Sequence, residues 1–418
     1  MKQGRVAVAG FRMRKRSSAP IVYGVGHGSL AHGFASLIES AHMRSIIKST
    51  HAFEKWMRKR TDISVKLLTK KHRKMAEGPF PFLRATFYRW VELWPEMCPR
   101  LAQRDEDVLL AVGDLHVENF GVWMDSRQRL IWGVNDFDDA CELPFTCDLV
   151  RLATSAVLAA SVAKVEVTPD WICARLLEGY KTGLREAEPI LISRDANAAL
   201  TRLTRGTREE PKKFWGTKLD PDDNPEVDGS DLPKGLEDMF RASFRSRARA
   251  TFREQKSPGG LGSLGRRRFT AVETVKKGVY SAREAKALVP SALYWLTGQD
   301  RMPSQTATIL QHAIRVPDPY FQVHDRWLIR QLAPDIAKIE MPKDPSDKRL
   351  TLAPALLRLM GQETANIHLG SLSGADLEKR LKQLAREDRW LPSATERMTA
   401  RMLADHSKWA EHCPVETP

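Results

Sequence analysis

Two short apolar runs with a polar turn between them form the clearest pattern in the chain. Residues 120–124 and 130–134 are mainly apolar, and residues 125–128 are Asp, Ser, Arg and Gln. Apolar runs that flank such a turn predict a β-hairpin. A hairpin brings its two ends side by side, so the residues just before and just after it should be neighbours. Another apolar run, residues 108–112, precedes the hairpin and predicts a buried segment.

Longer stretches elsewhere predict helices and a second pair of strands. Residues 147–163 and 171–187 have helical patterns, and residues 352–411 carry Leu, Met and Trp at recurring positions. Residues 269–275 and 278–283 lie on either side of a Lys-Lys-Gly turn and predict two strands. The longest apolar run, residues 153–163, contains Thr154, Ser155 and Ser161. We expect a buried helix there and no membrane span. The mixture of patterns predicts an α+β fold.

Polar residues gather at the two ends of the predicted hairpin. Asp114, His116 and Asn119 precede it, and Asp136 and Asp138 follow it. The hairpin should therefore bring Asp114 and Asn119 close to Asp136. Such oxygen ligands suit Mg²⁺, which takes one or two carboxylates and leaves its other positions to water and phosphate. A carboxylate outside the metal shell could orient or deprotonate a hydroxyl. The alternative is structural, because Asp and Asn are common at turns and helix caps.

These segments resemble known proteins. The sequences GDLHVENFG (113–121) and NDFDDA (135–140) resemble the catalytic loop and the metal-binding segment of protein-kinase-like phosphotransferases, especially the aminoglycoside and choline kinase branch. The chain more closely resembles the bacterial domain-of-unknown-function family 2252. Further similar segments are KMAEGPFPFLRA (74–85), CDLVRLATSAVLAA (147–160), GGLGSLGRRRF (259–269), AREA (282–285), WLIRQL (327–332) and TANIH (364–368). The resemblance implies a two-lobed, kinase-like fold.

The resemblance also implies roles for individual residues. Asp114 would orient the acceptor hydroxyl, and Asn119 and Asp136 would hold Mg²⁺, with Asp138 as a further candidate near the metal. Phosphoryl transfer depends mostly on positioning and charge neutralisation, which such a set supplies. His116 matches a histidine of the family's loop, and for it a hydrogen bond that shapes the loop is favoured over proton transfer. Either Asp138 or its neighbour Asp139 could instead cap a helix.

A glycine-rich segment, residues 257–265, follows the catalytic segment, whereas in an ordinary kinase the glycine-rich loop comes first. We therefore expect a circular permutation of the kinase-like fold. Gly260, Gly262 and Gly265 would lie at the mouth of the second strand pair and bind ATP phosphates together with Arg283. A flexible linker would have a similar composition, so the glycines alone do not decide.

Two departures from the family patterns favour an alternative function. Arg283 stands where a lysine would bind ATP phosphates, and a planar guanidinium differs from a compact ammonium. Residues 305–316 contain no carboxylate, so the lysine–glutamate pair of kinases is not evident, although Lys276 or Lys286 could replace the lysine. A nucleotide-binding pseudokinase or scaffold is therefore the main alternative. A metal-dependent phosphohydrolase is a weaker one, because its usual fuller Asp and His set is not evident.

Arg84 is a further candidate site residue. It lies between an aromatic, proline-containing segment and an amphipathic run that contains Trp90 and Trp94. As a structural residue it would pair with an acidic helix or cap a helix end. As a functional residue it would contact a phosphate or the acceptor near Asp114. The sequence leaves both roles open.

Composition and charge suit a cytoplasmic enzyme. The chain has 418 residues and a formal net charge of +14, with basic residues concentrated in positions 12–16, 66–74 and 241–268. Such a charge attracts polyanions. No nucleic-acid-binding motif accompanies it, so nucleic acid is not expected as a partner. The five cysteines are scattered and form no CxxC pair, which indicates neither a disulfide framework nor a zinc site.

The expected organisation has five regions. They are a basic arm and helix (1–49), a catalytic lobe (50–200), a polar linker or surface excursion (201–235), a nucleotide lobe (236–341) and C-terminal helices that pack on the catalytic lobe (342–418). The function expected is ATP- and Mg²⁺-dependent phosphoryl transfer to a small-molecule hydroxyl. The acceptor and the oligomeric state cannot be deduced from the sequence.

Overall fold

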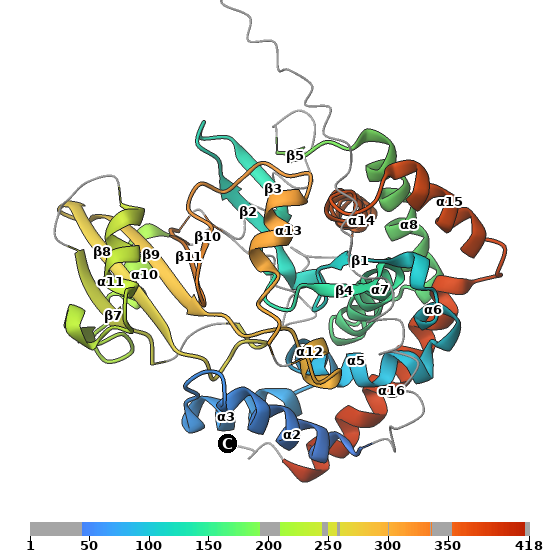
Figure 1. Cartoon of the computed structure of the whole chain (residues 1–418), viewed down its shortest axis with the longest axis horizontal. Coiled ribbons are helices and arrows are strands. Elements are labelled where there is room, and N and C mark those ends of the chain that lie inside the picture. The colour runs from blue at the N-terminus through green and yellow to red at the C-terminus, as the bar shows by residue number, and fades with distance from the viewer. Residues whose placement is uncertain are drawn as a thin grey trace, which may run out of the picture.

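The computed structural model describes residues 44–192, 210–244, 250–256, 260–299, 301–334, 336 and 353–413. Most of the predicted basic arm and part of the predicted polar linker lie outside these residues. Helices and sheets are both abundant, which confirms the α+β class (Figure 1). A large hydrophobic core lies among the helices, and two smaller clusters lie on the two faces of a six-stranded sheet.

Most of the helices gather on one side of the molecule (Figure 1). They are α2 (Ile46–Arg58), α3 (Val65–Ala76), α4 (Pro79–Ala85), α5 (Phe87–Met97), α6 (Pro99–Ala102), α7 (Phe145–Val162), α8 (Pro169–Glu186), α14 (Pro354–His368), α15 (Gly374–Leu384) and α16 (Trp390–His412). The predicted helices at 147–163 and 171–187 correspond to α7 and α8. By length and composition α7 could cross a membrane, but 83% of it is buried inside the protein, as in a core helix.

The predicted hairpin is confirmed. Strands β2 (Phe120–Met124) and β3 (Leu130–Val134) pair antiparallel, with Phe120 opposite Val134. The short strand β5 (Ile190–Leu191) extends this sheet beside β3. The apolar run before the hairpin forms β1 (Val108–Ala111), which pairs with β4 (Cys141–Pro144). Because β1 leads into the hairpin and β4 leaves it, the segments 112–119 and 135–140 are held beside each other.

The second sheet has six antiparallel strands in the order β10-β11-β9-β8-β7-β6. They are β6 (Glu226–Val227), β7 (Ala250–Glu254), β8 (Arg268–Lys276), β9 (Val279–Ala287), β10 (Gln322–His324) and β11 (Trp327–Leu332). The helix α11 (Leu236–Ser243) packs on an apolar face of this sheet, and α10 (Pro211–Lys218) packs on part of the other face (Figure 1). The remaining part of that second face carries charged side chains and is turned toward the hairpin segments.

Two segments pack on elements that lie outside their own predicted regions. The strand β6 belongs to the six-stranded sheet and the helix α10 packs on that sheet, although both lie in the predicted linker. The helices α12 (Ala292–Leu296) and α13 (Thr306–His312), which lie in the predicted nucleotide lobe, contribute Leu293 and Ile309 to the large core. The physical reason is the same in both places, since each segment carries apolar side chains that only the neighbouring core can bury.

The helices α8 and α14 cross at a distance that only glycine allows. A Cβ atom at Gly179 would overlap the carbonyl oxygen of Arg358, and one at Gly361 would overlap that of Leu176. We expect Gly179→Ala to lower the free energy of unfolding by at least about 2 kcal/mol, because rigid backbone atoms must move apart. Urea denaturation measures the change.

The matched control for this prediction is Gly216→Ala. Gly216 lies in α10, and a Cβ there would meet nothing within 4 Å. Alanine should raise the free energy of unfolding by about 0.5–1 kcal/mol at that position, because it is the better helix former. Equal effects of the two substitutions would show that α8 and α14 do not need their close approach.

Candidate functional site

The segment between β1 and β2 forms a tight loop that fixes the position of Asp114. Gly113 has φ +80°, and a Cβ there would overlap the carbonyl oxygen of Asp139. Only glycine suits both conditions. Asp114 is thereby placed beside the segment that follows the hairpin, as its sequence position predicted.

His116 and Asn119 hold the next turn of this loop. The Oδ1 atom of Asn119 accepts from the backbone N–H of His116 at 2.5 Å, and Nδ1 of His116 accepts from the backbone N–H of Glu118 at 3.2 Å. Each side chain thus binds the backbone of the other end of the turn, which is a capping box around the short helix η2 (Val117–Asn119). This placement favours the loop-shaping role for His116.

A buried carboxylate on α7 supports the start of the same loop. The Oδ2 and Oδ1 atoms of Asp148 accept from the backbone N–H groups of Val112 and Gly113 at 2.7 and 3.0 Å. Nε2 of His368, on α14, lies 3.1 Å from Asp148 Oδ2, and Nδ1 of His368 lies 3.0 Å from the Tyr180 hydroxyl. All three side chains are fully buried. The helix α14 therefore helps to fix the loop that carries Asp114.

The carboxylate of Asp114 pairs with Arg151, a fully buried residue of α7. Nε of Arg151 donates to Asp114 Oδ1 at 3.1 Å, and Nη2 donates both to the same oxygen and to the Leu83 carbonyl. Burial raises the pKa of Asp114 to about 7, although Arg151 opposes the rise. Such a pKa suits a proton acceptor that works near neutral pH.

Arg84 forms an ion pair with Glu118, between Nη1 and Oε2 at 2.5 Å. Its guanidinium also lies 5.6 Å from the ring centre of Phe80. The backbone carbonyl oxygen of Arg84 and Oδ2 of Asp114 both lie near Gly262. Arg84 is therefore a neighbour of Asp114, and its side chain contacts the loop through Glu118.

The segment after the hairpin meets cations from the six-stranded sheet. Nζ of Lys286, on β9, lies 3.3 Å from Asp136 Oδ1 and 2.6 Å from Asp138 Oδ1. Nη1 of Arg266 lies 3.2 Å from Asp138 Oδ2. Lys286 is almost completely buried, whereas the side chain of Asp136 is 26% exposed. Buried ions are retained when they are paired, and this pairing joins the sheet to the hairpin segments.

Asp139 has a different role from its two neighbours. Its Oδ1 atom accepts at 3.1 Å from the backbone N–H of Ala292, the first residue of α12. It is therefore the aspartate that binds a helix start, one of the two roles left open for Asp138 and Asp139. Burial raises its pKa, and the charge of Arg266 opposes that change.

The glycine-rich segment lies against the loop of Asp114. A Cβ atom on Gly262 would be 3.3 Å from both Asp114 Oδ2 and the Arg84 carbonyl oxygen. The carbonyl of Gly265 accepts from the backbone N–H of Ser64 at 3.0 Å. Gly260 and Gly265 have φ values of +91° and +111°. The structure thus brings Gly262 to Asp114, whereas Gly260 lies near Arg268 and Gly265 lies beside Ile63 and Leu68.

Arg283 does not share this location. Residues 283 and 286 of β9 point to opposite faces of the sheet, because side chains alternate along a strand. The guanidinium of Arg283 lies 4.1 Å from the ring centre of Tyr320 and 4.9 Å from that of Phe244, which follows α11. Its predicted contact with ATP phosphates has no support from this placement. Lys286 is the cation of β9 that reaches the aspartates.

Glu284 shares the charged face of the sheet with Lys286. It accepts from Arg268 Nη1 at 3.2 Å, from Arg330 Nε at 2.7 Å and from Gln255 Nε2 at 3.0 Å. Burial opposes its ionisation, but the charges of Arg330 and Arg268 outweigh burial and hold its pKa well below the usual range. This glutamate keeps the buried Arg268 and the partly exposed Arg330 in place beside Lys286.

The fit of these residues to Mg²⁺ is partial. Within the described ranges, no three His, Cys, Asp or Glu side chains are grouped as metal ligands. Asn119 uses its Oδ1 atom on the backbone, and both oxygens of Asp138 face cations. Asp136, the most exposed of the three predicted ligands, is the best suited. Since Mg²⁺ is often held by one or two carboxylates and phosphate oxygens, a metal here would depend on a phosphate ligand.

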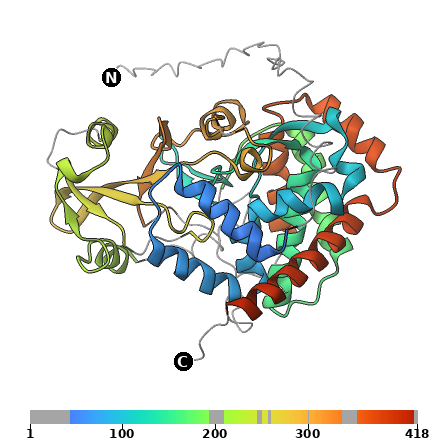
Figure 2. The ribbon, with the colours of Figure 1, turned by 60° about the horizontal axis from the view of Figure 1, so that its bottom comes forward.

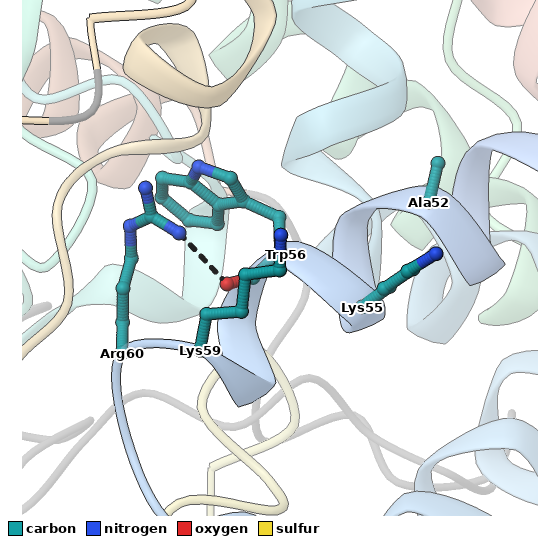
Figure 3. A pocket seen from close by; sticks show the side chains of 5 residues that line it. All are labelled: Ala52, Lys55, Trp56, Lys59 and Arg60. Carbon is teal, nitrogen blue, oxygen red and sulfur yellow. Dashed lines mark hydrogen bonds between the residues drawn. The ribbon is translucent and has the colours of Figure 1, made fainter.

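A shallow hollow of about 360 Å³ lies elsewhere, on the outer side of α2 (Figure 3). The residues that line it are Ala52, Lys55, Trp56, Lys59 and Arg60. The Arg60 guanidinium covers the Trp56 ring at 3.9 Å and donates to the Trp56 carbonyl at 2.9 Å. None of the predicted site residues lines this hollow.

Two site residues were missed in the sequence. Lys71, on α3, is buried and donates from Nζ to the Gly262 carbonyl at 3.2 Å. Arg266 contacts Asp138. A signal for Lys71 was present, because it lies four residues from both Leu67 and Met75, on the apolar stripe of an amphipathic helix. A lysine on such a stripe requires a buried partner. For Arg266 only its place beside the glycines was suggestive.

Comparison with known proteins supports the similarity to the bacterial family, but gives no match that supports the similarity to kinases. No curated protein and no solved structure matches the chain. One protein family matches, over residues 64–219. The matched segment contains Lys71, Arg84, Asp114 and Asp136, but neither the glycine-rich segment nor β9. Residues 64–219 are therefore similar to the family described as "Uncharacterized protein conserved in bacteria (DUF2252)".

Proposed function

We propose that the protein is an ATP- and Mg²⁺-dependent phosphotransferase that acts on a small-molecule hydroxyl, with a permuted, two-lobed, kinase-like fold. The observation that carries the proposal is a convergence of two distant segments. Lys286 of the sheet contacts Asp136 and Asp138, while Gly262 lies against Asp114. The two aspartates, Asp114 and Asp136, therefore lie near a glycine-rich segment and a buried cation. Phosphoryl transfer depends on such positioning and charge neutralisation.

The reaction that this arrangement supports is a direct transfer. The acceptor hydroxyl attacks the γ-phosphorus, its proton passes to the carboxylate of Asp114, and the bond from the γ-phosphorus to the bridging oxygen of ADP breaks. Arg151 keeps the Asp114 carboxylate in place, and Lys286 and Arg266 offset phosphate charge. Asp136, with Asn119 after release of its backbone contact, would hold Mg²⁺, which neutralises charge on the phosphates.

A second candidate function is a nucleotide-binding pseudokinase. Two contacts favour it, since Asn119 Oδ1 binds the His116 backbone and Asp138 pairs with both Lys286 and Arg266. A protein that keeps these contacts would bind a nucleotide with little dependence on metal. It would have no turnover, because the metal ligands would not be released.

Binding of ATP with and without Mg²⁺ tests the proposal. In the wild type, we expect Mg²⁺ to strengthen ATP binding, and we expect Asp136→Ala to weaken Mg²⁺·ATP binding by about 10–100-fold, because a charged ligand contact is worth about 1.5–3 kcal/mol. Isothermal titration calorimetry measures both effects. Asp222→Ala, at an exposed turn, is the matched control and should bind as the wild type does.

The outcomes separate the two functions. Binding that depends on Mg²⁺ and on Asp136 supports the phosphotransferase. Binding that is indifferent to both supports the pseudokinase. Failure of the wild type to bind ATP would overturn both, and the kinase resemblance would then reflect only local sequence similarity.

A further inference from the structure

Lys71 is a buried cation with few partners. It lies on the inner side of α3 and is 3% exposed, whereas the neighbouring Lys70 is exposed. Figure 2 shows α3 among the blue helices, between the six-stranded sheet and α16. The ammonium makes one hydrogen bond, from Nζ to the carbonyl oxygen of Gly262 at 3.2 Å. Within the part of the chain that the structure describes, no carboxylate lies within ion-pair distance of it.

This coordination is incomplete for a buried ammonium. The group has three N–H donors, and buried charges are normally paired because their desolvation is costly. The charged groups that face it are Glu54 on α2, Asp114 and Asp139 beside the hairpin, and Arg266, which follows the glycine-rich segment. The carboxylate of Glu54 is bound to His72, Asp114 to Arg151, and Asp139 to the start of α12. None of these carboxylates is available to Lys71 alone.

Burial is the main cause that lowers the pKa of Lys71, to about 8. Arg266 also lowers this pKa, and Glu54, Asp114 and Asp139 raise it. The ammonium is therefore mostly charged at neutral pH and loses its proton slightly above it. A bound anion would raise the pKa, because the charged form would gain a partner.

Two further arginine N–H groups have no hydrogen-bond partner among the described residues. They are the Nε atoms of Arg84 and Arg266, and both atoms are buried. Arg266 is 5% exposed and follows the glycine-rich segment directly, and the Arg84 carbonyl lies at Gly262. Lys71 and Arg266 thus lie close to Asp114, and Arg84 of α4 contacts the same loop through Glu118.

We propose that Lys71, together with Arg84 and Arg266, binds the anionic oxygens of a phosphoryl group beside Asp114. Two sources share this chemistry, the phosphoryl group that ATP donates and a phosphate already present on the acceptor. The inference rests on the proposed function for the role of the anion, but not for the existence of the anion site. A phosphoryl oxygen would accept from the ammonium beside the Gly262 carbonyl or in its place.

Binding of inorganic phosphate tests the site without any nucleotide. We expect Lys71→Met to weaken phosphate binding by about 10–100-fold at about pH 7, since one charged hydrogen bond is lost. Lys70→Met removes the same charge from the exposed side of the same helix and should change affinity by less than about twofold, because exposed charges are screened. Calorimetry measures affinity, and a melting curve of each variant verifies folding.

The dependence on pH provides a second test that loss of packing would not affect. The free lysine has a pKa of about 8. Wild-type affinity should therefore decrease between about pH 7 and about pH 9, and phosphate binding at the higher pH should take up a proton. In Lys71→Met this decrease should be absent or much smaller, although Asp114 still titrates. Heats measured in buffers of different ionisation enthalpy report the proton uptake.

Nucleotides distinguish the two sources of the anion. If Lys71 binds the donated phosphoryl group, Lys71→Met weakens Mg²⁺·ATP binding and leaves Mg²⁺·ADP binding unchanged. If it binds a phosphate on the acceptor, both nucleotides bind normally and only inorganic phosphate is affected. Equal phosphate affinity of wild type and Lys71→Met overturns the site. Phosphate binding that depends on Lys71 without any ATP binding keeps the site and overturns the proposed phosphotransferase.

Discussion

Asp114→Asn is expected to reduce ATP turnover by about 10²–10⁴-fold, the usual contribution of a positioned general base. Affinity for Mg²⁺·ATP should change by less than about threefold, because Asp114 pairs with Arg151 and not with Lys286. The amide keeps the shape of the side chain but cannot accept the hydroxyl proton. Phosphate release in the steady state measures turnover, with water as the acceptor until a better one is found.

The pH dependence of turnover separates this role from a structural one. The pKa of Asp114 is about 7, and only the deprotonated form accepts a proton. The wild-type rate should therefore increase about tenfold per pH unit below pH 7 and level off above it. The residual rate of Asp114→Asn should lack this increase, and Asp222→Asn, an exposed control, should retain it. An unchanged pH profile in Asp114→Asn would assign the titration to another group and remove Asp114 as the base.

Local patterns predicted the hairpin and its neighbours correctly. A hairpin is determined mainly by residues that are close in the sequence, namely two apolar runs and the polar turn between them. The structure confirms the hairpin, because Phe120 pairs with Val134. The position of Asp114 beside residues 135–140 followed from that pairing. The capping box of His116 and Asn119 is also local, because its contacts span three residues. These parts of the site could be predicted from the sequence.

Local patterns could not predict whether Arg283 or Lys286 of β9 contacts the aspartates. The alternation of β9 places Arg283 and Lys286 on opposite faces, but the sequence of β9 does not say which face is turned to the hairpin. The packing of Phe240 and other residues of α11 against Phe269 and Ala285 decides this. Such contacts join segments that are far apart in the sequence. Arg283 was selected by its alignment with a family motif, and tertiary packing placed it elsewhere.

The buried ion pairs of the site could not be predicted from the sequence either. Arg151 lies in the mostly apolar helix α7, where a buried cation requires a partner. In the structure Arg151 pairs with Asp114, because Asp148 is bound to backbone N–H groups and to His368. Partners of buried charges are determined by the three-dimensional arrangement of helices. Only the requirement for a partner could be deduced from the sequence.

Asp148→Ala should have the largest effect on stability of any substitution in the site. It would leave the backbone N–H groups of Val112 and Gly113 and the His368 ring without their acceptor in a fully buried place. Removing one partner of a buried charged network costs about 3–5 kcal/mol, so we expect a decrease of that size in the free energy of unfolding. Urea denaturation, followed by fluorescence, measures it.

The same substitution should loosen the loop of Asp114 before the whole protein unfolds. Hydrogen exchange of the backbone amides of residues 110–116 should accelerate more than exchange in α16, because Val112 and Gly113 lose their acceptor directly. Asp170→Ala is the matched control, since Asp170 pairs with Arg389 at the surface and exposed ion pairs contribute little. If Asp148→Ala were no more harmful than Asp170→Ala, or if exchange accelerated equally in the loop and in α16, Asp148 would not be what positions Asp114. An accelerated loop in a folded protein would instead show that the loop of Asp114 depends on a carboxylate of α7 and, through His368, on α14.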